Sequence, residues 1–218
     1  MTPAMAFDRK RAEGALVDVL EGLVGDRIAG MGFRLLDGVI ATACHCLPRL
    51  QGKVVLPDPD APGAPPVTVR LRHPATGEVA LAALVAADPC SDFALLRALP
   101  ESVPVPPGAG ASFAGIVAGL ERLPLARSPL AEQRVSFCTH ERRWVEGLAR
   151  GASITVWDDA SRIRRGTSGA PVFDQDGRVV GLVGSNDVRL PSATMCLLAE
   201  RLPAWALREA AELSERGA

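Results

Sequence analysis

The stretch GTSGAPVF at residues 166–173 places Ser168 in a glycine turn ahead of a short apolar run. Two earlier segments supply the partners that a reactive serine needs, because TACHC contains the imidazole of His45 and SDFALL contains the carboxylate of Asp92. A serine hydroxyl is a poor nucleophile at neutral pH, so acyl transfer requires a base to take its proton and an acid to orient that base. We therefore predict that Ser168, His45 and Asp92 form one site.

The turn before Ser168 also suits the stabilisation of an oxyanion. Attack on a carbonyl builds negative charge on its oxygen, and each preorganised backbone N–H group stabilises that charge by roughly 3 to 4 kcal/mol. Gly166 lacks a Cβ and can adopt a positive φ, which would turn its amide inward. We predict the amides of Gly166 and Ser168 as the two donors.

The order His45, Asp92, Ser168 resembles that of the chymotrypsin-like serine proteases and differs from that of α/β-hydrolases and subtilisins. The flanking motifs TAxHC, DFALL and GxSGxP are similar to those of this family, and VVGLV at residues 179–183 resembles the strand that follows its serine. The resemblance extends from about residue 15 to about residue 186. It implies two antiparallel six-stranded β-barrels and a serine endopeptidase that acts on protein or peptide substrates without a metal or organic cofactor.

Each segment taken alone has an ordinary structural explanation. Gly-x-Ser-Gly can be a simple glycine turn, a single histidine beside apolar residues is usually structural, and Asp92 can cap a turn. We favour a site because all three segments occur together in the family's order. Of the other histidines, His73 lies in a turn between strand-like runs, and His140 precedes a charged stretch with no nucleophile motif beside it.

The sequence departs from many secreted family members at two positions. Thr167 stands where those members carry an aspartate that receives a newly cut N-terminal ammonium, and Ala170 replaces the usual second glycine after the serine. The chain in this respect resembles the bacterial high-temperature-requirement branch. The alternative is a latent or catalytically silent module with the protease fold that binds a peptide or a partner protein. In a bacterial defence or signalling system, an activating protein partner could switch the latent form on.

The resemblance implies a substrate pocket built from the segment before Gly166 and the strand after the serine. Arginines in residues 161–165 can pair an acidic substrate residue in bidentate fashion, although a solvated basic loop is the simpler interpretation. A pocket that accepts small or aliphatic substrate residues is the other alternative. The predicted substrate-binding residues are Arg162, Ile163, Arg165, Gly184, Ser185 and Asn186.

Composition narrows the class of protein. The chain has 218 residues, 48% of them hydrophobic, so it can bury a substantial core, and its net charge of -1 points to neither nucleic acid nor an anionic membrane surface. No apolar run reaches the roughly 18 residues of a spanning helix, and residues 1–11 do not form a signal peptide, so we predict a cytoplasmic protein. Arginine far outnumbers lysine, a bias associated with GC-rich bacterial genomes.

Five cysteines, an odd number, argue against a full disulfide framework. Cys44, Cys46 and Cys90 come close to the predicted site, where they could bind zinc, take part in redox chemistry or simply fill space. We favour space filling because their spacing matches no standard zinc pattern. Cys138 and Cys196 are predicted to be core residues.

Short aliphatic runs separated by Gly, Pro, Asp and Asn indicate antiparallel strands and a single all-β peptidase domain over residues 1–218. It comprises a first barrel over residues 12–100, a linker near 100–110, a second barrel over 111–190 and a C-terminal α-helix over 195–216. Residues 15–23 can also be an amphipathic helix. The predicted strands of the first barrel are 15–20, 32–36, 39–43, 53–56, 67–72, 78–85 and 93–96. Those of the second are 112–117, 133–139, 144–149, 153–157, 170–173 and 179–185, with a hairpin turn at Asp176-Gly177.

Overall fold

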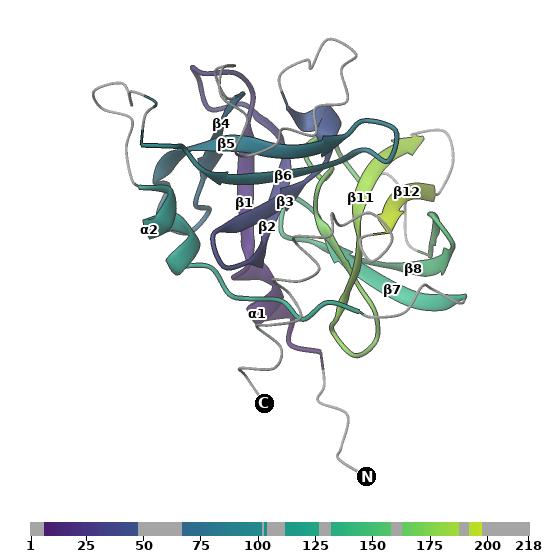
Figure 1. Ribbon diagram of the computed structural model, residues 1–218. Coiled ribbons are helices and arrows are strands. Elements are labelled where there is room, and N and C mark those ends of the chain that lie inside the picture. Colours follow the sequence, from purple (N-terminus) through teal and green to yellow (C-terminus); the bar gives the residue numbers. More distant parts are fainter. Residues whose placement is uncertain are drawn as a thin grey trace.

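A computed structural model of the chain describes residues 7–47, 67–101, 103, 112–126, 132–157, 163–187 and 192–197. Twelve strands form two closed barrels that lie side by side, one from each half of the sequence (Figure 1). This confirms the predicted all-β double barrel. Within the described residues, no helix is both long and apolar enough to cross a membrane.

The first barrel closes in the order β1-β2-β3-β6-β5-β4, with antiparallel pairing throughout. Within residues 15–23, for which a helix was the alternative, Leu16–Leu20 are extended and pair with both β2 and β4. The predicted strand at residues 53–56 lies outside the described residues. The strands are β1 (Leu16–Leu20), β2 (Ile28–Leu36), β3 (Val39–Thr42), β4 (Thr68–Arg72), β5 (Val79–Asp88) and β6 (Phe93–Ala98).

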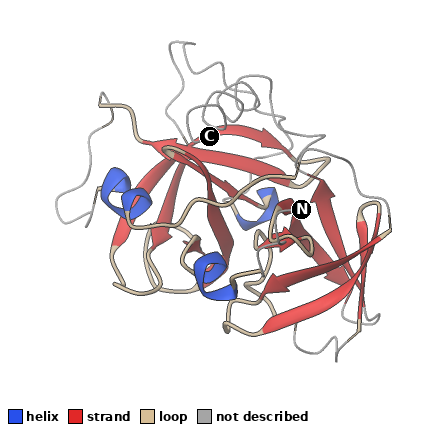
Figure 2. Ribbon diagram, turned by 90° about the horizontal axis from the view of Figure 1, so that it is seen from below, coloured by secondary structure: helices blue, strands red, loops and turns tan. Residues whose placement is uncertain are grey.

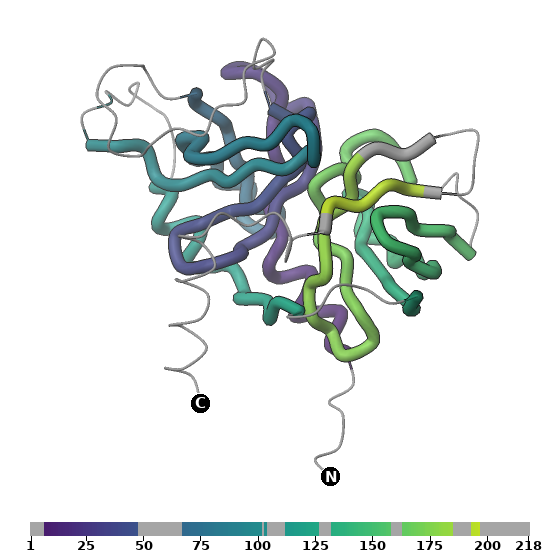
Figure 3. Tube along the Cα trace, turned by 45° about the vertical axis from the view of Figure 1, so that its right-hand side comes forward, coloured from purple at the N-terminus to yellow at the C-terminus, as the bar shows by residue number. Residues whose placement is uncertain are grey.

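The second barrel closes in the order β10-β11-β12-β9-β8-β7, again antiparallel. Figure 3 shows its green and yellow tube beside the purple and teal tube of the first barrel. The Asp176-Gly177 turn is as predicted: Gly177 has φ +75, and the Asp174 carboxylate accepts from the amides of Asp176 and Arg178. The strands are β7 (Gln133–Cys138), β8 (Trp144–Arg150), β9 (Ser153–Val156), β10 (Pro171–Phe173), β11 (Val179–Asp187) and β12 (Ser192–Leu197).

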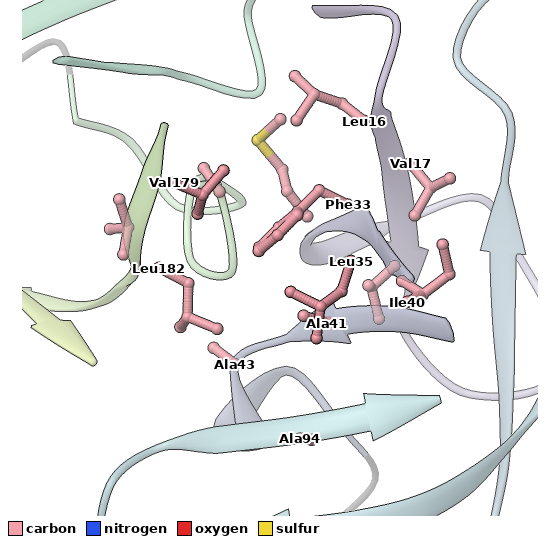
Figure 4. Close-up of a cluster of buried hydrophobic side chains, with 14 of the residues drawn as sticks. Leu16, Val17, Phe33, Leu35, Ile40, Ala41, Ala43, Ala94, Val179 and Leu182 are labelled. Carbon is pink, nitrogen blue, oxygen red and sulfur yellow. The ribbon is translucent and has the colours of Figure 1, made fainter. Parts of the chain in front are cut away.

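The buried side chains of the two barrels join into one apolar cluster. Figure 4 shows Val179 and Leu182 of the second barrel facing Phe33 and Ala43 of the first, and all four are fully or almost fully buried. Burial of apolar surface is the main favourable term in folding, at about 25 cal/mol per Å². The barrels are therefore held against each other by the same core that holds each one together.

Residues 112–117 form a helix, contrary to the predicted strand. Helix α2 (Phe113–Ala118) begins after Ser112, whose side chain accepts a hydrogen bond from the amide of Gly115 at 3.0 Å. The buried residues Phe113, Ile116 and Val117 recur at the spacing of a helix face rather than at every second position. The N-cap serine and this spacing decide the outcome. Figure 2 shows this helix at the outer edge of the first barrel, on the left of the view.

The segment from Met195, predicted as helical, begins instead in a strand. Strand β12 pairs with β11 and β9, and without it the second barrel could not close. Alternation supports it, because Ala193 and Met195 are buried while Thr194 between them is exposed. The remainder of the predicted C-terminal helix lies outside the described residues, as does nearly all of the predicted linker.

The N-terminal segment connects the two barrels. Helix α1 (Arg9–Glu13) precedes β1 of the first barrel, yet Glu13 accepts a hydrogen bond from the indole of Trp144 in β8 at 2.7 Å. Phe7 packs between Trp144 and Phe173, with ring centroids 5.2 and 4.9 Å away. The residues leading into the first barrel are thus anchored on the second.

Candidate active site

Strand register brings His45 and Asp92 together. His45 lies in the short helix η1 (Cys44–Cys46), which follows β3, and Asp92 directly precedes β6. Because Thr42 of β3 pairs with Ala94 of β6, the end of one strand meets the start of the other. Two residues that are 47 positions apart in the sequence are therefore adjacent.

Asp92 holds His45 at two points. Its Oδ2 lies 2.7 Å from Nδ1 of the imidazole, and its Oδ1 accepts from the His45 amide at 2.9 Å. A third hydrogen bond runs from the Cys44 amide to the Asp92 carbonyl at 3.2 Å. Asp92 adopts φ +55, a left-handed conformation that aspartate tolerates better than most residues. An ionised carboxylate only accepts hydrogen bonds, so Nδ1 carries the proton and Nε2 faces away from Asp92.

The hydrogen bond to Asp92 raises the pKa of His45 from 6.5 to about 10. A further hydrogen bond with Cys46 acts in the same direction, while burial opposes both. The imidazole is about half exposed and so can exchange protons with solvent. The raised pKa favours the protonated imidazole, and only the neutral form can serve as a base.

Ser168 lies where the two barrels meet. Its carbonyl accepts a hydrogen bond from the amide of Met31 in β2 at 2.7 Å, and the thiol of Cys46 lies 3.8 Å from the same oxygen. On its other side, the amide of Gly169 donates to Val183 of β11 at 2.7 Å. Gly169 has φ +86, and a Cβ there would overlap the Met31 carbonyl. Only glycine therefore lets the serine peptide enter this junction.

The hydroxyl of Ser168 donates to the carbonyl of Gly184 at 3.1 Å. Among the hydrogen bonds of the described residues, none joins this hydroxyl to the imidazole of His45. Gly184 itself borders Asp92, since a Cβ on Gly184 would lie 3.4 Å from Oδ2 of the carboxylate. The structure thus brings the three predicted residues to one junction, with the serine side chain turned toward Gly184.

The turn before Ser168 presents two amides. Gly166 has φ +94, the positive value expected from the sequence. Within the described part of the chain, the amides of Gly166 and Ser168 donate to no protein acceptor, whereas the amide of Thr167 donates to Arg164 at 3.2 Å and that of Gly169 to Val183. Backbone amides without a partner are rare in folded proteins. Among the described residues, these two donors on one turn therefore have no protein acceptor, and a ligand could bind them.

The predicted pocket residues are described only in part. Ile163 is buried, and Arg165 is exposed next to Gly166. Arg164 pairs with Glu141 at 3.1 Å, which agrees with a solvated basic loop more than with a dedicated acid-binding pocket. Arg162 and the side chains of Ser185 and Asn186 lie outside the described residues.

The sequence analysis gave His140 no role in the site, yet in the structure its ring lies next to Gly166. A Cβ on Gly166 would be 3.3 Å from Cγ of its imidazole, and Nδ1 of this ring is buried without a hydrogen-bond partner. No local motif marks His140, because the contact arises from the closure of the second barrel. His73, by contrast, is the loop residue expected, since its Nδ1 accepts from the amides of Ala75 and Thr76.

Four of the cysteines are buried, and Cys90 is exposed. Cys138 and Cys196 belong to the core, as predicted. Burial raises the pKa of the Cys44 thiol to about 11, with Asp92 adding to the effect, so this thiol holds its proton. Zinc binding and redox reactions require the thiolate. Among the described residues, no group of three or more His, Cys, Asp or Glu side chains has the arrangement of a metal site.

A family model described as the trypsin-like peptidase domain matches residues 30–182, most of the chain. The chain belongs to this family. No curated protein sequence matches it. Its two six-stranded barrels are the fold of this family. His45 and Asp92 come from the first barrel, and Ser168 comes from the second.

Solved structures that this trypsin-like domain resembles include three proteases. The serine endoprotease from Yersinia pestis is 17% identical with a TM-score of 0.58, over 92% of this chain and 67% of that one. Deg5 is 19% identical with a TM-score of 0.55, over 88% and 87%. The serine protease of a human pathogenic astrovirus is 18% identical with a TM-score of 0.52, over 88% and 94%. At these identities the likeness establishes the fold.

Proposed function

We propose that the chain is a serine endopeptidase that cleaves protein or peptide substrates through an acyl-enzyme on Ser168. The observation that carries the proposal is the pair of hydrogen bonds that the Asp92 carboxylate accepts from the imidazole and the amide of His45, at the same junction as Ser168. A carboxylate that binds Nδ1 fixes one tautomer and leaves Nε2 to accept the serine proton. The high-temperature-requirement branch, with Thr167 in place of an aspartate, is part of the proposal.

The reaction proceeds in two stages. Neutral His45 takes the proton of the Ser168 hydroxyl as Oγ bonds to the substrate carbonyl carbon, and the amides of Gly166 and Ser168 bind the resulting oxyanion. The protonated imidazole then gives its proton to the departing amine as the C–N bond breaks. Water, activated by His45, hydrolyses the ester and restores the hydroxyl. Neither stage uses a metal or organic cofactor.

The resting geometry requires two adjustments before attack. The Ser168 side chain must rotate away from the Gly184 carbonyl toward Nε2, and His45 must lose its proton. A bound substrate promotes the first adjustment by occupying the junction. An activating protein partner would act at the same step. A chain that is labelled on its own needs no such partner, whereas a chain that is labelled only with a partner present is latent.

The test is reaction with a fluorophosphonate probe followed by mass spectrometry of the adduct. We expect the purified chain to be labelled on Ser168, and Ser168→Ala and His45→Ala to lose labelling and peptide cleavage while keeping the fold. Ser112→Ala makes the same chemical change at a helix cap on the first-barrel side of the chain and should be labelled like the wild type. An adduct on another residue, or cleavage retained by Ser168→Ala, would refute the assignment.

A further inference from the structure

The turn between β7 and β8, residues 139–143, contacts both the first barrel and residues 164–170. We call it the 139–143 hairpin. We call residues 164–170 the oxyanion turn, because they carry the amides of Gly166 and Ser168. The hairpin is tightly closed, because Thr139 donates its amide to the Arg143 carbonyl at 2.8 Å and the Arg142 amide donates to the Thr139 carbonyl at 2.9 Å. The Thr139 hydroxyl also accepts from the Arg143 amide at 3.2 Å, and this threonine is fully buried. A turn closed by three hydrogen bonds moves as a unit.

On one side, the hairpin touches the oxyanion turn at two places. The His140 ring lies against Gly166, with Cγ, Cδ2 and Nδ1 all within 3.5 Å of the position that a Cβ on Gly166 would take. Glu141 pairs with Arg164 at 3.1 Å, and the Arg164 carbonyl in turn accepts from the Thr167 amide. The hairpin therefore contacts this turn at Arg164 and at Gly166, on the N-terminal side of Ser168.

On the other side, the hairpin reaches the first barrel through a buried ion cluster. The guanidinium of Arg142 lies 3.8 Å from Oδ1 of Asp18 in β1, and Arg72 of β4 donates to Oδ2 at 2.7 and 3.0 Å. The Asp18 side chain is only 7% exposed. A buried carboxylate that lost Arg142 would lose part of its charge compensation, so this contact resists breaking.

Arg142 also has a strained backbone. Its φ of +62 is uncommon for a residue other than glycine, asparagine or aspartate, and such strain persists only where the surroundings enforce it. Within the described part of the chain, its Nη1 is buried without a hydrogen-bond partner. The fold thus tolerates a locally unfavourable backbone conformation at the residue whose side chain pairs with Asp18.

We propose that the 139–143 hairpin positions the oxyanion turn from the first barrel, with His140 and Arg142 as the positioning residues. In this arrangement His140 packs against Gly166 of the second barrel, and Arg142 of the same hairpin pairs with Asp18 of the first barrel, which also binds Arg72. The inference rests on the proposed function for its catalytic consequence only. Its structural content, that the hairpin orders residues 164–170, can be measured without any activity.

The structural arm of the test is amide hydrogen exchange of residues 164–170, measured by mass spectrometry on the full chain. His140→Ala removes the ring, and Arg142→Asn removes the ion pair while keeping a residue that tolerates positive φ. Both should raise exchange in residues 164–170 by at least about 10-fold, while residues 179–183 of β11 exchange as in the wild type. His140→Phe restores a ring and should recover protection. Arg143→Ala is the matched control, since the Arg143 side chain is exposed and, among the described residues, its ion pair is with Glu141 in the same hairpin.

The catalytic arm measures kcat and KM separately for a cleaved peptide. Oxyanion donors act in the transition state, so both variants should lower kcat by about 10- to 100-fold with KM changed little. Exchange in residues 164–170 at the wild-type rate in both variants overturns the proposal, as does a rise in KM at unchanged kcat. A wild-type chain with neither labelling nor cleavage refutes the proposed function, and exchange alone then decides whether the hairpin orders the turn.

Discussion

Gly30 in β2 is the most sensitive test of how the first barrel positions Ser168. A Cβ on Gly30 would lie 2.7 Å from the Ser168 carbonyl oxygen and would overlap the Cys46 thiol. Real Cβ atoms do not approach a neighbour closer than 3.0 Å, so the carbonyl must move by about 0.3 Å or β2 must shift away from it. Either movement disturbs the hydrogen bond from the neighbouring Met31 amide to the same oxygen.

Gly30→Ala should therefore affect both stability and the serine. Overpacking of a tight interior costs about 1 to 3 kcal/mol of unfolding free energy. Because a misplacement of about 1 Å costs roughly 10²-fold in rate, the smaller shift here should slow fluorophosphonate labelling on the order of 10-fold. Urea denaturation measures the first quantity, and the second-order rate of labelling measures the other.

Two further variants separate the contacts. Adding Cys46→Ala to Gly30→Ala removes the overlapping sulfur and should recover part of the stability, while labelling stays slow because the Ser168 carbonyl is still too close. Gly119→Ala is the control: Gly119 has φ -78, and the nearest atom to a Cβ there is 3.5 Å away. Wild-type stability and labelling in Gly30→Ala would show that β2 does not position the serine as we have argued.

The remaining predictions concern the proton on His45, a buried hydroxyl and a helix cap. The rate of labelling should increase as pH rises toward the His45 pKa of about 10, because only the neutral imidazole accepts a proton. Asp92→Asn should move this increase toward pH 6.5 and also slow the reaction. A labelling rate that does not change between pH 7 and 10 contradicts the assignment. Thr167→Val should leave the free energy of unfolding unchanged or raise it by up to about 1 kcal/mol, because among the described residues the buried Oγ1 of Thr167 has no hydrogen-bond partner. A free energy of unfolding lowered by more than about 1 kcal/mol in urea denaturation would contradict this and show that the hydroxyl is hydrogen-bonded. Ser112→Ala should cost about 1 kcal/mol of unfolding free energy by removing the cap of α2, and an unchanged denaturation midpoint would show that the cap is dispensable.

The sequence predicted most strands because their signal is local. In β4 and β8, buried and less buried residues alternate, which is the period of a strand with one face in the core. The error at residues 112–117 had a local cause too. Ser112 followed by apolar residues at helical spacing is the pattern of a capped helix, and the strand prediction did not take this spacing into account.

Strand β12 illustrates a limit of local analysis. Methionine, cysteine and leucine in its second half favour neither structure strongly, and its extended form is decided by the need to close the barrel between β9 and β11. Tertiary pairing of this kind overrides weak propensities. A sequence read segment by segment does not contain that requirement.

The three predicted site residues were found because they lie in short motifs, and the structure brings them to one place. The contacts that surround them were not predictable in the same way. His140 meets Gly166, and Arg142 meets Asp18, only after both barrels have closed and packed against each other. Such contacts depend on three-dimensional proximity between residues that carry no shared sequence pattern.

The hydrogen bond from Met31 to the Ser168 carbonyl has a consequence for inhibition. The peptide that bears the hydroxyl is hydrogen-bonded to a strand of the opposite barrel, so the position of Ser168 depends on how the two barrels pack against each other. Under the proposed function, a perturbation that separated β2 from residues 168–169 would inhibit cleavage without contacting the hydroxyl itself.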